Sequence, residues 1–309
     1  FLTNVRPGGL KRSGLDYETM AAANPKLVYC SLTGYGLDGP DADKPGFDIA
    51  SFWSRSGVAR STIPKGQEPF PLRTAVGDHT TSMAAAAGIC AALVQAGKTG
   101  KGQLVEASLL RSALYAMGSD FAIQLFFGRL ASTKQRHETM VPITNFFQSK
   151  DGHWINITAR QGSADWAPSC RVINREDLIE DERFTSAKTR RANAAELVGL
   201  LDEGFAQFTK EELIPRLDEH QLAWAPVQTM GEAAADPQVI AAGAIAQTPS
   251  ASGDGSTYAS PASPIRFPGA DDGPKGPSPK TGEHTRDVLE MAGLSADEID
   301  AHFEAGTVA

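Results

Sequence analysis

Runs of β-forming residues predict strands in the first part of the chain. Residues 26–33 (KLVYCSLT) form a compact apolar run between a proline and a glycine, which is typical of a buried strand. Residues 103–108 (QLVEAS) alternate as a strand does, and residues 1–5 resemble the end of another strand that enters a turn at 7–9. Glycine, aspartate and proline fill residues 34–46, which predicts a loop long enough to carry function.

Helical spacing predicts the elements between and after these strands. The expected helices of this part cover residues 15–24, 48–58, 82–95 and 109–127. The third is rich in alanine and glycine, so it can pack closely against its neighbours as a central helix. Alternation of helices and strands predicts an α/β fold.

The pattern changes after a composition break at residues 128–136. Two short β-runs flank Lys150-Asp151-Gly152, which predicts a hairpin. Further helices are expected at 192–208, 210–220, 283–291 and 295–303, the last capped by Ser295. We therefore divide the chain into a large domain (1–130), a small domain (131–240) and a C-terminal part (241–309) that returns to the large domain.

Composition narrows the functional classes. The 309 residues carry a net charge of −8, which argues against binding nucleic acid or an anionic membrane through the whole surface. Three cysteines lie far apart and predict neither a disulfide framework nor a metal site, and no secretory signal is present, so a cytoplasmic setting is expected. Because residue 1 lies within a strand pattern, we expect that an N-terminal segment precedes this sequence.

One motif imitates a dinucleotide-binding fingerprint. Residues 34–39 (GYGLDG) spell G-x-G-x-x-G directly after a predicted strand. The fingerprint needs a helix to start there, but a segment rich in proline and aspartate follows. A glycine-rich turn is therefore the preferred interpretation.

Asp78 is the strongest candidate for chemistry. It sits in the segment VGDHTT immediately before the predicted central helix. It could cap that helix, and it could equally be catalytic, because the partial positive charge of a helix start favours a carboxylate that can attack an activated acyl group. His79 is a secondary candidate for a general base.

An ordered series of short motifs resembles the family III CoA-transferases, the group of formyl-CoA transferase and the carnitine and bile-acid CoA-transferases. The motifs, which continue along essentially the whole chain, include NVRPG (4–8), NPKLVY (24–29), PGFD (45–48), GD (77–78), GKTGKGQ (97–103), KDG (150–152), DERF (181–184) and GEHT (282–285). Each motif is weak alone, but their order and spacing are specific.

The resemblance implies a Rossmann-like large domain with a smaller inserted α+β domain, in a homodimer of interlocked rings. It implies an enzyme that moves CoA from an acyl-CoA thioester to a free carboxylic acid, with Asp78 as the nucleophile that carries covalent intermediates. Coenzyme A thioesters and carboxylic acids would be substrates and no cofactor or metal would be permanently bound; no nucleic acid or membrane partner is expected.

The resemblance also implies a set of residues along the CoA path. The candidate CoA-binding residues are Asn4, Arg6, Arg12, Gly34, Lys44, Phe47 and Asp48. Without the resemblance, the two arginines would be solvated surface charges and Asp48 a helix N-cap. The loop 160–163 (RQGS) is a loose match to a glycine loop that covers the reacting centre.

Position 47 separates two activities within the family. The racemase branch, which epimerises 2-methylacyl-CoA thioesters, has a histidine base where this sequence has Phe47, and phenylalanine cannot exchange a proton. CoA transfer is therefore favoured over a racemase-like isomerase, and a catalytically silent CoA-binding or scaffold protein is the third hypothesis. The identity of the acids stays open.

Overall fold

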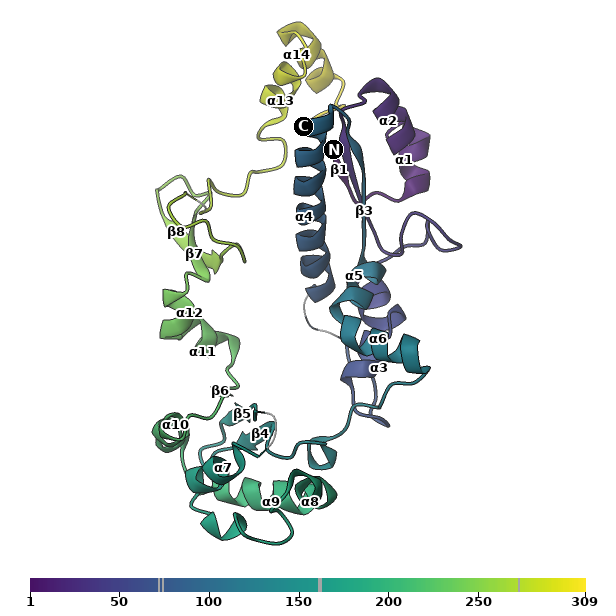
Figure 1. Ribbon diagram of the computed structural model, residues 1–309. Helices are drawn as coiled ribbons and strands as arrows, with labels where there is room; N and C mark the ends of the chain where they lie inside the picture. The colour runs from purple at the N-terminus through teal and green to yellow at the C-terminus, as the bar shows by residue number, and fades with distance from the viewer. Residues whose placement is uncertain (72, 74, 161–162, 272) are drawn as a thin grey trace. The chain divides into compact units, whose positions relative to one another are not determined.

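A computed structural model describes residues 1–71, 73, 75–160, 163–271 and 273–309. The chain forms two compact units, one built from residues 1–145 and 160–204, the other from residues 146–159 and 205–309 (Figure 1). Each unit mixes helices and strands. The three-part domain division made from the sequence stays a prediction.

A parallel sheet organises the first unit. Strands β1 (Leu2–Thr3), β2 (Val28–Thr33) and β3 (Gln103–Ser108) lie in the order β1-β2-β3. Side chains of β2 are almost all buried, as expected for a central strand covered on both faces. All three predicted strands are confirmed.

Helix α4 (Val76–Thr99) packs against β2 and β3 (Figure 1). Small residues permit this close packing, because a Cβ added to Gly88 would lie only 2.8 Å from Cγ1 of Val105. Ala85 joins Cys30 in a small buried cluster between helix and sheet. The central helix is confirmed, but it starts six residues earlier than the sequence predicted and extends to Thr99.

A second core lies around the π-helix η1 (Ile49–Arg55), which is followed by α3 (Val58–Thr62). Phe52 and Trp53 pack there with residues of α3 and of α5 (Leu109–Ala116). A helix was predicted for 48–58, whereas the backbone forms a π-helix that ends before α3. The predicted helix 109–127 is also divided, because the backbone leaves helical geometry at Met117 between α5 and α6 (Gly118–Phe127).

The turn expected at residues 7–9 is wrong, because α1 (Pro7–Ser13) forms there. Pro7 occupies the first helical turn, where its missing N–H costs nothing, and Gly14 ends the helix in the left-handed region. Helix α2 (Tyr17–Ala23) follows as predicted. The remaining helices of this unit are η2 (Arg136–Glu138), α7 (Trp166–Val172), η3 (Glu176–Leu178), α8 (Ala187–Ala192) and α9 (Ala194–Phe205).

The second unit contains the predicted hairpin. Strands β4 (Asn145–Gln148) and β5 (Trp154–Ile157) are neighbours in a sheet completed by β6 (Trp224–Pro226), and Gly152 turns between the first two with φ +86°. A second hairpin, formed by β7 (Ile245–Pro249) and β8 (Thr257–Pro261), was not predicted. The other elements of this unit are α10 (Lys210–Glu219), α11 (Met230–Ala235), α12 (Pro237–Ala241), β7 (Ile245–Pro249), β8 (Thr257–Pro261), α13 (Thr285–Met291) and α14 (Ala296–Glu304).

Helix α4 is, among the described residues, long and apolar enough to cross a membrane by length and composition alone. The core helices of large globular enzymes meet the same criterion. Its apolar side chains Met83, Leu93 and Val94 are more than half exposed in this single chain.

Candidate functional site

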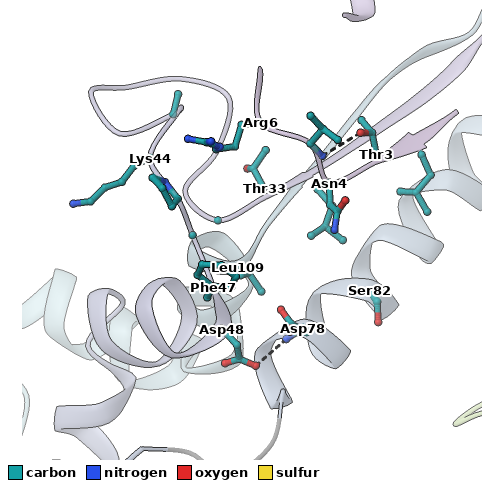
Figure 2. A pocket seen from close by; sticks show the side chains of 17 residues that line it. Thr3, Asn4, Arg6, Thr33, Lys44, Phe47, Asp48, Asp78, Ser82 and Leu109 are labelled. Atoms are coloured by element: carbon teal, nitrogen blue, oxygen red, sulfur yellow. Dashed lines mark hydrogen bonds between the residues drawn. The ribbon is translucent and has the colours of Figure 1, made fainter. Parts of the chain in front are cut away.

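A cavity of about 980 Å³ lies at the carboxyl ends of the parallel strands (Figure 2). Thr3 ends β1, Thr33 ends β2, and Leu109 directly follows β3; all three line the cavity. Ligands of open α/β sheets bind at this edge, because the loops that leave the strands diverge there. The cavity is therefore the candidate active site.

The structure brings the residues of the sequence prediction together. Asn4, Arg6, Gly34, Lys44, Phe47, Asp48 and Asp78 all line this cavity. Arg12, on α1, instead lines a smaller cavity of about 320 Å³ that it shares with Arg6. Seven of the eight candidates therefore face one space, and the eighth lies beside it; their individual roles stay predictions.

Asp78 lies in the first turn of α4, not before the helix as the sequence suggested. Its side chain is exposed and lines the cavity, so solvent and ligands reach its carboxylate. Partial burial raises the pKa of Asp78, the negative charge of Asp48 adds to the rise, and His79 partly opposes it. Lost hydration and a second carboxylate both disfavour the ionised form of Asp78, which is opposite in direction to the effect expected from the helix start alone. His79 is not among the described residues that line the cavity.

Two glycines shape the cavity wall. A Cβ added to Gly34 would lie 2.6 Å from Cα of Gly46, and the reverse is equally true. The chain therefore crosses itself with backbone against backbone where β2 gives way to the loop, and any side chain at either position would separate the two segments. Gly34 has a structural reason to be glycine whatever it contacts in a ligand.

Positive charge gathers at the loop side of the cavity. Arg6, Lys44 and Arg12 are exposed, and none of them forms an ion pair within the part of the chain described. The Arg6 guanidinium donates to the carbonyl oxygen of Asp43 (3.0 Å), whose carboxylate accepts from the N–H of Gly8 (2.8 Å). These bonds hold the start of α1 against the loop and leave guanidinium donors available for an anion such as phosphate.

Phe47 presents an aromatic ring to the cavity with 74% of its surface exposed. A ring without an ionisable group offers packing area but no proton transfer. The cavity thus has a carboxylate at Asp78 and an apolar surface nearby, without a base at position 47.

Sequence reasoning missed several residues that line the cavity. Thr33 could have been found from its position at the carboxyl end of a strand, and Ser82 from its spacing of one helical turn after Asp78. Leu32 and Leu109 gave no signal, because apolar residues are unremarkable beside a strand. Of the suggested covering loop 160–163, residues 161 and 162 lie outside the described residues.

Comparison with known proteins identifies the family of this chain. The sequence model of CoA-transferase family III matches residues 1–285. The (R)-2-hydroxy-4-methylpentanoate CoA-transferase of Clostridioides difficile is 30% identical over 97% of this chain and 74% of its own length. The cinnamoyl-CoA:phenyllactate CoA-transferase of Clostridium sporogenes is 32% identical over 97% of this chain and 73% of its own length.

Solved structures share the fold. A CaiB/BaiF family protein from Brucella suis superposes with a TM-score of 0.81 at 28% identity, covering 93% of this chain and 74% of that one. A protein from Mycobacterium tuberculosis at 24% identity, with a TM-score of 0.79, covers 92% of this chain and 75% of its own and adds support for the fold. With the family's sequence model matching nearly the whole chain, this protein belongs to CoA-transferase family III and is a CoA-transferase.

Proposed function

We propose that this enzyme moves CoA from an acyl-CoA thioester to a free carboxylic acid through covalent intermediates on Asp78. The observation that carries the proposal is the exposed Asp78 carboxylate at the wall of the cavity, in the first turn of α4. A carboxylate oxygen is a competent nucleophile toward an activated acyl group. A raised pKa makes the ionised carboxylate a stronger nucleophile.

The proposed steps need no added acid, base or oxidant. A carboxylate oxygen of Asp78 attacks the thioester carbonyl, the C–S bond breaks, and the CoA thiolate leaves with the electron pair, which gives a mixed anhydride. The thiolate then attacks the carbonyl carbon of Asp78, which forms an aspartyl-CoA thioester and releases the donor acid as a carboxylate. The acceptor carboxylate repeats these two steps in reverse order and regenerates the Asp78 carboxylate.

Both covalent intermediates hydrolyse if water reaches them, so the proposal requires a sheltered site. Asp78 is exposed in a single chain, and a second copy that covers the cavity would provide the shelter. Helices α5 and α6 support such a partner, because Tyr115, Leu125 and Phe126 are more than 80% exposed. The proposed assembly is the interlocked homodimer of Rossmann-like large domains with smaller inserted domains.

The CoA moiety is proposed to lie along the loop side of the cavity. Arg6, Lys44 and Arg12 supply positive charge there, which suits the phosphate groups of CoA. Asn4 adds an amide to the lining of the same cavity. The acyl group would then point toward Asp78 and the ring of Phe47.

The acceptor class is proposed from the relatives. The names of the two relatives above specify (R)-2-hydroxy-4-methylpentanoate and phenyllactate, both 2-hydroxy monocarboxylic acids with an apolar substituent. The apolar cavity surface at Phe47 and Leu109 suits such a substituent. Acids of this class are therefore the first acceptors to test.

The test is intact-mass analysis of the protein after incubation with acyl-CoAs, in the presence and absence of a 2-hydroxy acid acceptor. The expected result is a CoA adduct on the peptide that contains Asp78, removed by hydroxylamine and by the acceptor, and absent in Asp78→Asn. Native mass measurement of the same sample gives the number of chains. A matched control is Asp16→Asn, because Asp16 caps α2 and does not line the cavity. Undiminished transfer by Asp78→Asn would refute the proposal.

A further inference from the structure

The first turn of α4 lacks a cap of its own. Ala75 occupies the N-cap position and offers no side-chain acceptor, and the N–H of His79 is the one that bonds back to its carbonyl oxygen (3.0 Å). The N–H groups of Gly77 and Asp78 precede it and have no acceptor within the helix. A helix start without a capping side chain is less stable than a capped one.

Asp48 supplies the missing acceptor from a distant part of the sequence. Its Oδ2 atom accepts from the N–H of Gly77 (2.8 Å) and from the N–H of Asp78 (3.2 Å), as Figure 2 shows for the latter. These are the bonds that an N-cap residue makes, but Asp48 lies 29 residues before Gly77. The carboxylate therefore fixes the backbone of the nucleophile itself.

Asp48 is buried in a closely packed part of the fold. Only 8% of its surface is exposed, and it immediately precedes the π-helix η1, whose Phe52 packs directly over Gly77. Within the described residues its other oxygen, Oδ1, is buried with no hydrogen-bond partner. A buried carboxylate with one unpartnered oxygen reduces stability, which fits a role of Asp48 in function better than a role in stability alone.

We propose that Asp48 is a positioning residue of the transfer reaction: its carboxylate fixes the first turn of α4 and aims the Asp78 carboxylate into the cavity. This inference rests on the proposed role of Asp78. The family resemblance implied that Asp48 contacts CoA, and the positioning role is a different function for this residue. Small displacements of a reacting group reduce rates strongly, so the support of the backbone at Asp78 is part of the reaction geometry.

The electrostatic relation of the two carboxylates supports the same role. The negative charge of Asp48 contributes to the raised pKa of Asp78, after burial, while His79 acts in the opposite direction. Arg6 and Lys44 line the same cavity. An uncharged residue at position 48 that still accepts the two N–H bonds would keep the geometry and lower the pKa of the nucleophile.

Two variants separate these effects. Asp48→Ala removes the acceptor, and we expect the single-turnover rate of adduct formation on Asp78 to fall about 10- to 100-fold with KM for acyl-CoA changed less than about threefold. Asp48→Asn keeps an amide oxygen for both N–H groups, so its rate should stay within about fivefold of the parent enzyme. The acid limb of the rate-against-pH profile of Asp48→Asn should move to lower pH.

A control variant separates the loss of a helix cap from the loss of positioning at Asp78. Asp16→Ala removes a comparable cap from α2, so it should lower the melting temperature without changing the rate of adduct formation. An unchanged rate in Asp48→Ala, or a change confined to KM, would overturn the positioning role. If Asp48→Ala does not fold, a fall of about tenfold or more in the rate of Asp48→Asn, which keeps the acceptor for both N–H groups, overturns it. Asp78→Asn is assayed in parallel, because adduct formation there would refute the proposed function and the positioning role together. Loss of the adduct in Asp78→Asn with an unchanged rate in Asp48→Ala would overturn the positioning role alone.

Discussion

Replacement of Gly77 by alanine tests how the start of α4 is packed. A Cβ at this position would lie 2.3 Å from Cγ of Phe52, 2.5 Å from its Cβ and 2.7 Å from its Cδ2. These separations are far shorter than van der Waals contact, so either the ring or the helix must move. Phe52 is only 4% exposed and packs in a buried cluster with Trp53 and Leu109, so the ring has little room to rotate.

Two opposing terms set the magnitude of the effect. Overpacking of this kind reduces the free energy of unfolding by about 1–3 kcal/mol. Alanine is favoured over glycine within a helix by about 1 kcal/mol, which offsets part of the loss. Gly97→Ala in the same helix gains only the helix preference of alanine, because an added Cβ at Gly97 meets no atom within 4 Å. The difference between the two variants therefore isolates the overpacking term, about 1–3 kcal/mol.

Urea unfolding followed by tryptophan fluorescence, at one fixed protein concentration, measures this difference. Because Asp78 is the next residue, Gly77→Ala should also slow adduct formation by about tenfold or more, whereas Gly97→Ala should not. The structure indicates that Phe52 holds the start of the helix. Equal unfolding free energies and equal rates of adduct formation for the two variants would contradict this.

Two further predictions concern titration. Burial and the charge of Asp48 raise the pKa of Asp78 above its ordinary value of 3.8. As the pH falls through this raised pKa, the carboxylate is protonated and the rate of adduct formation should fall. An acid limb at or below pH 3.8 in the rate-against-pH profile would contradict this prediction. Burial raises the pKa of Cys170 to about 12, so its thiol should resist iodoacetamide at pH 8 in the folded protein and react after unfolding in urea. Peptide mapping by mass spectrometry reads the second result, and rapid labelling of folded protein would show that the helix α7 region is open.

Local signals in the sequence predicted much of the secondary structure. The apolar run at β2 and the alternation at β3 identified strands, because such patterns are set by side-chain burial on each face. Ser295 was expected to cap α14, and it does so in a capping box with Glu298. These elements depend on residues within a few positions of one another, so the sequence alone was sufficient.

The candidate site was identified less directly. Asp78 stood out from its position near a helix start, but Asn4, Arg6 and Lys44 were recognisable only through family resemblance, since exposed polar residues give no local signal. These three residues converge with Asp78 because the end of β1, the loop after β2 and the start of α4 meet at one edge of the sheet. Convergence of distant segments is a property of the topology.

The local sequence determined that a helix rich in small residues would lie near the centre of the fold, but not where it begins. The side chain of Ala75 cannot accept an N–H bond, so no capping side chain next to the helix in sequence specifies its first residue. Tertiary structure specifies it through Asp48, which accepts the first N–H groups, and through Phe52, which packs against Gly77. The orientation of Asp78 thus depends on residues about 30 positions earlier, whose proximity only the folded backbone creates.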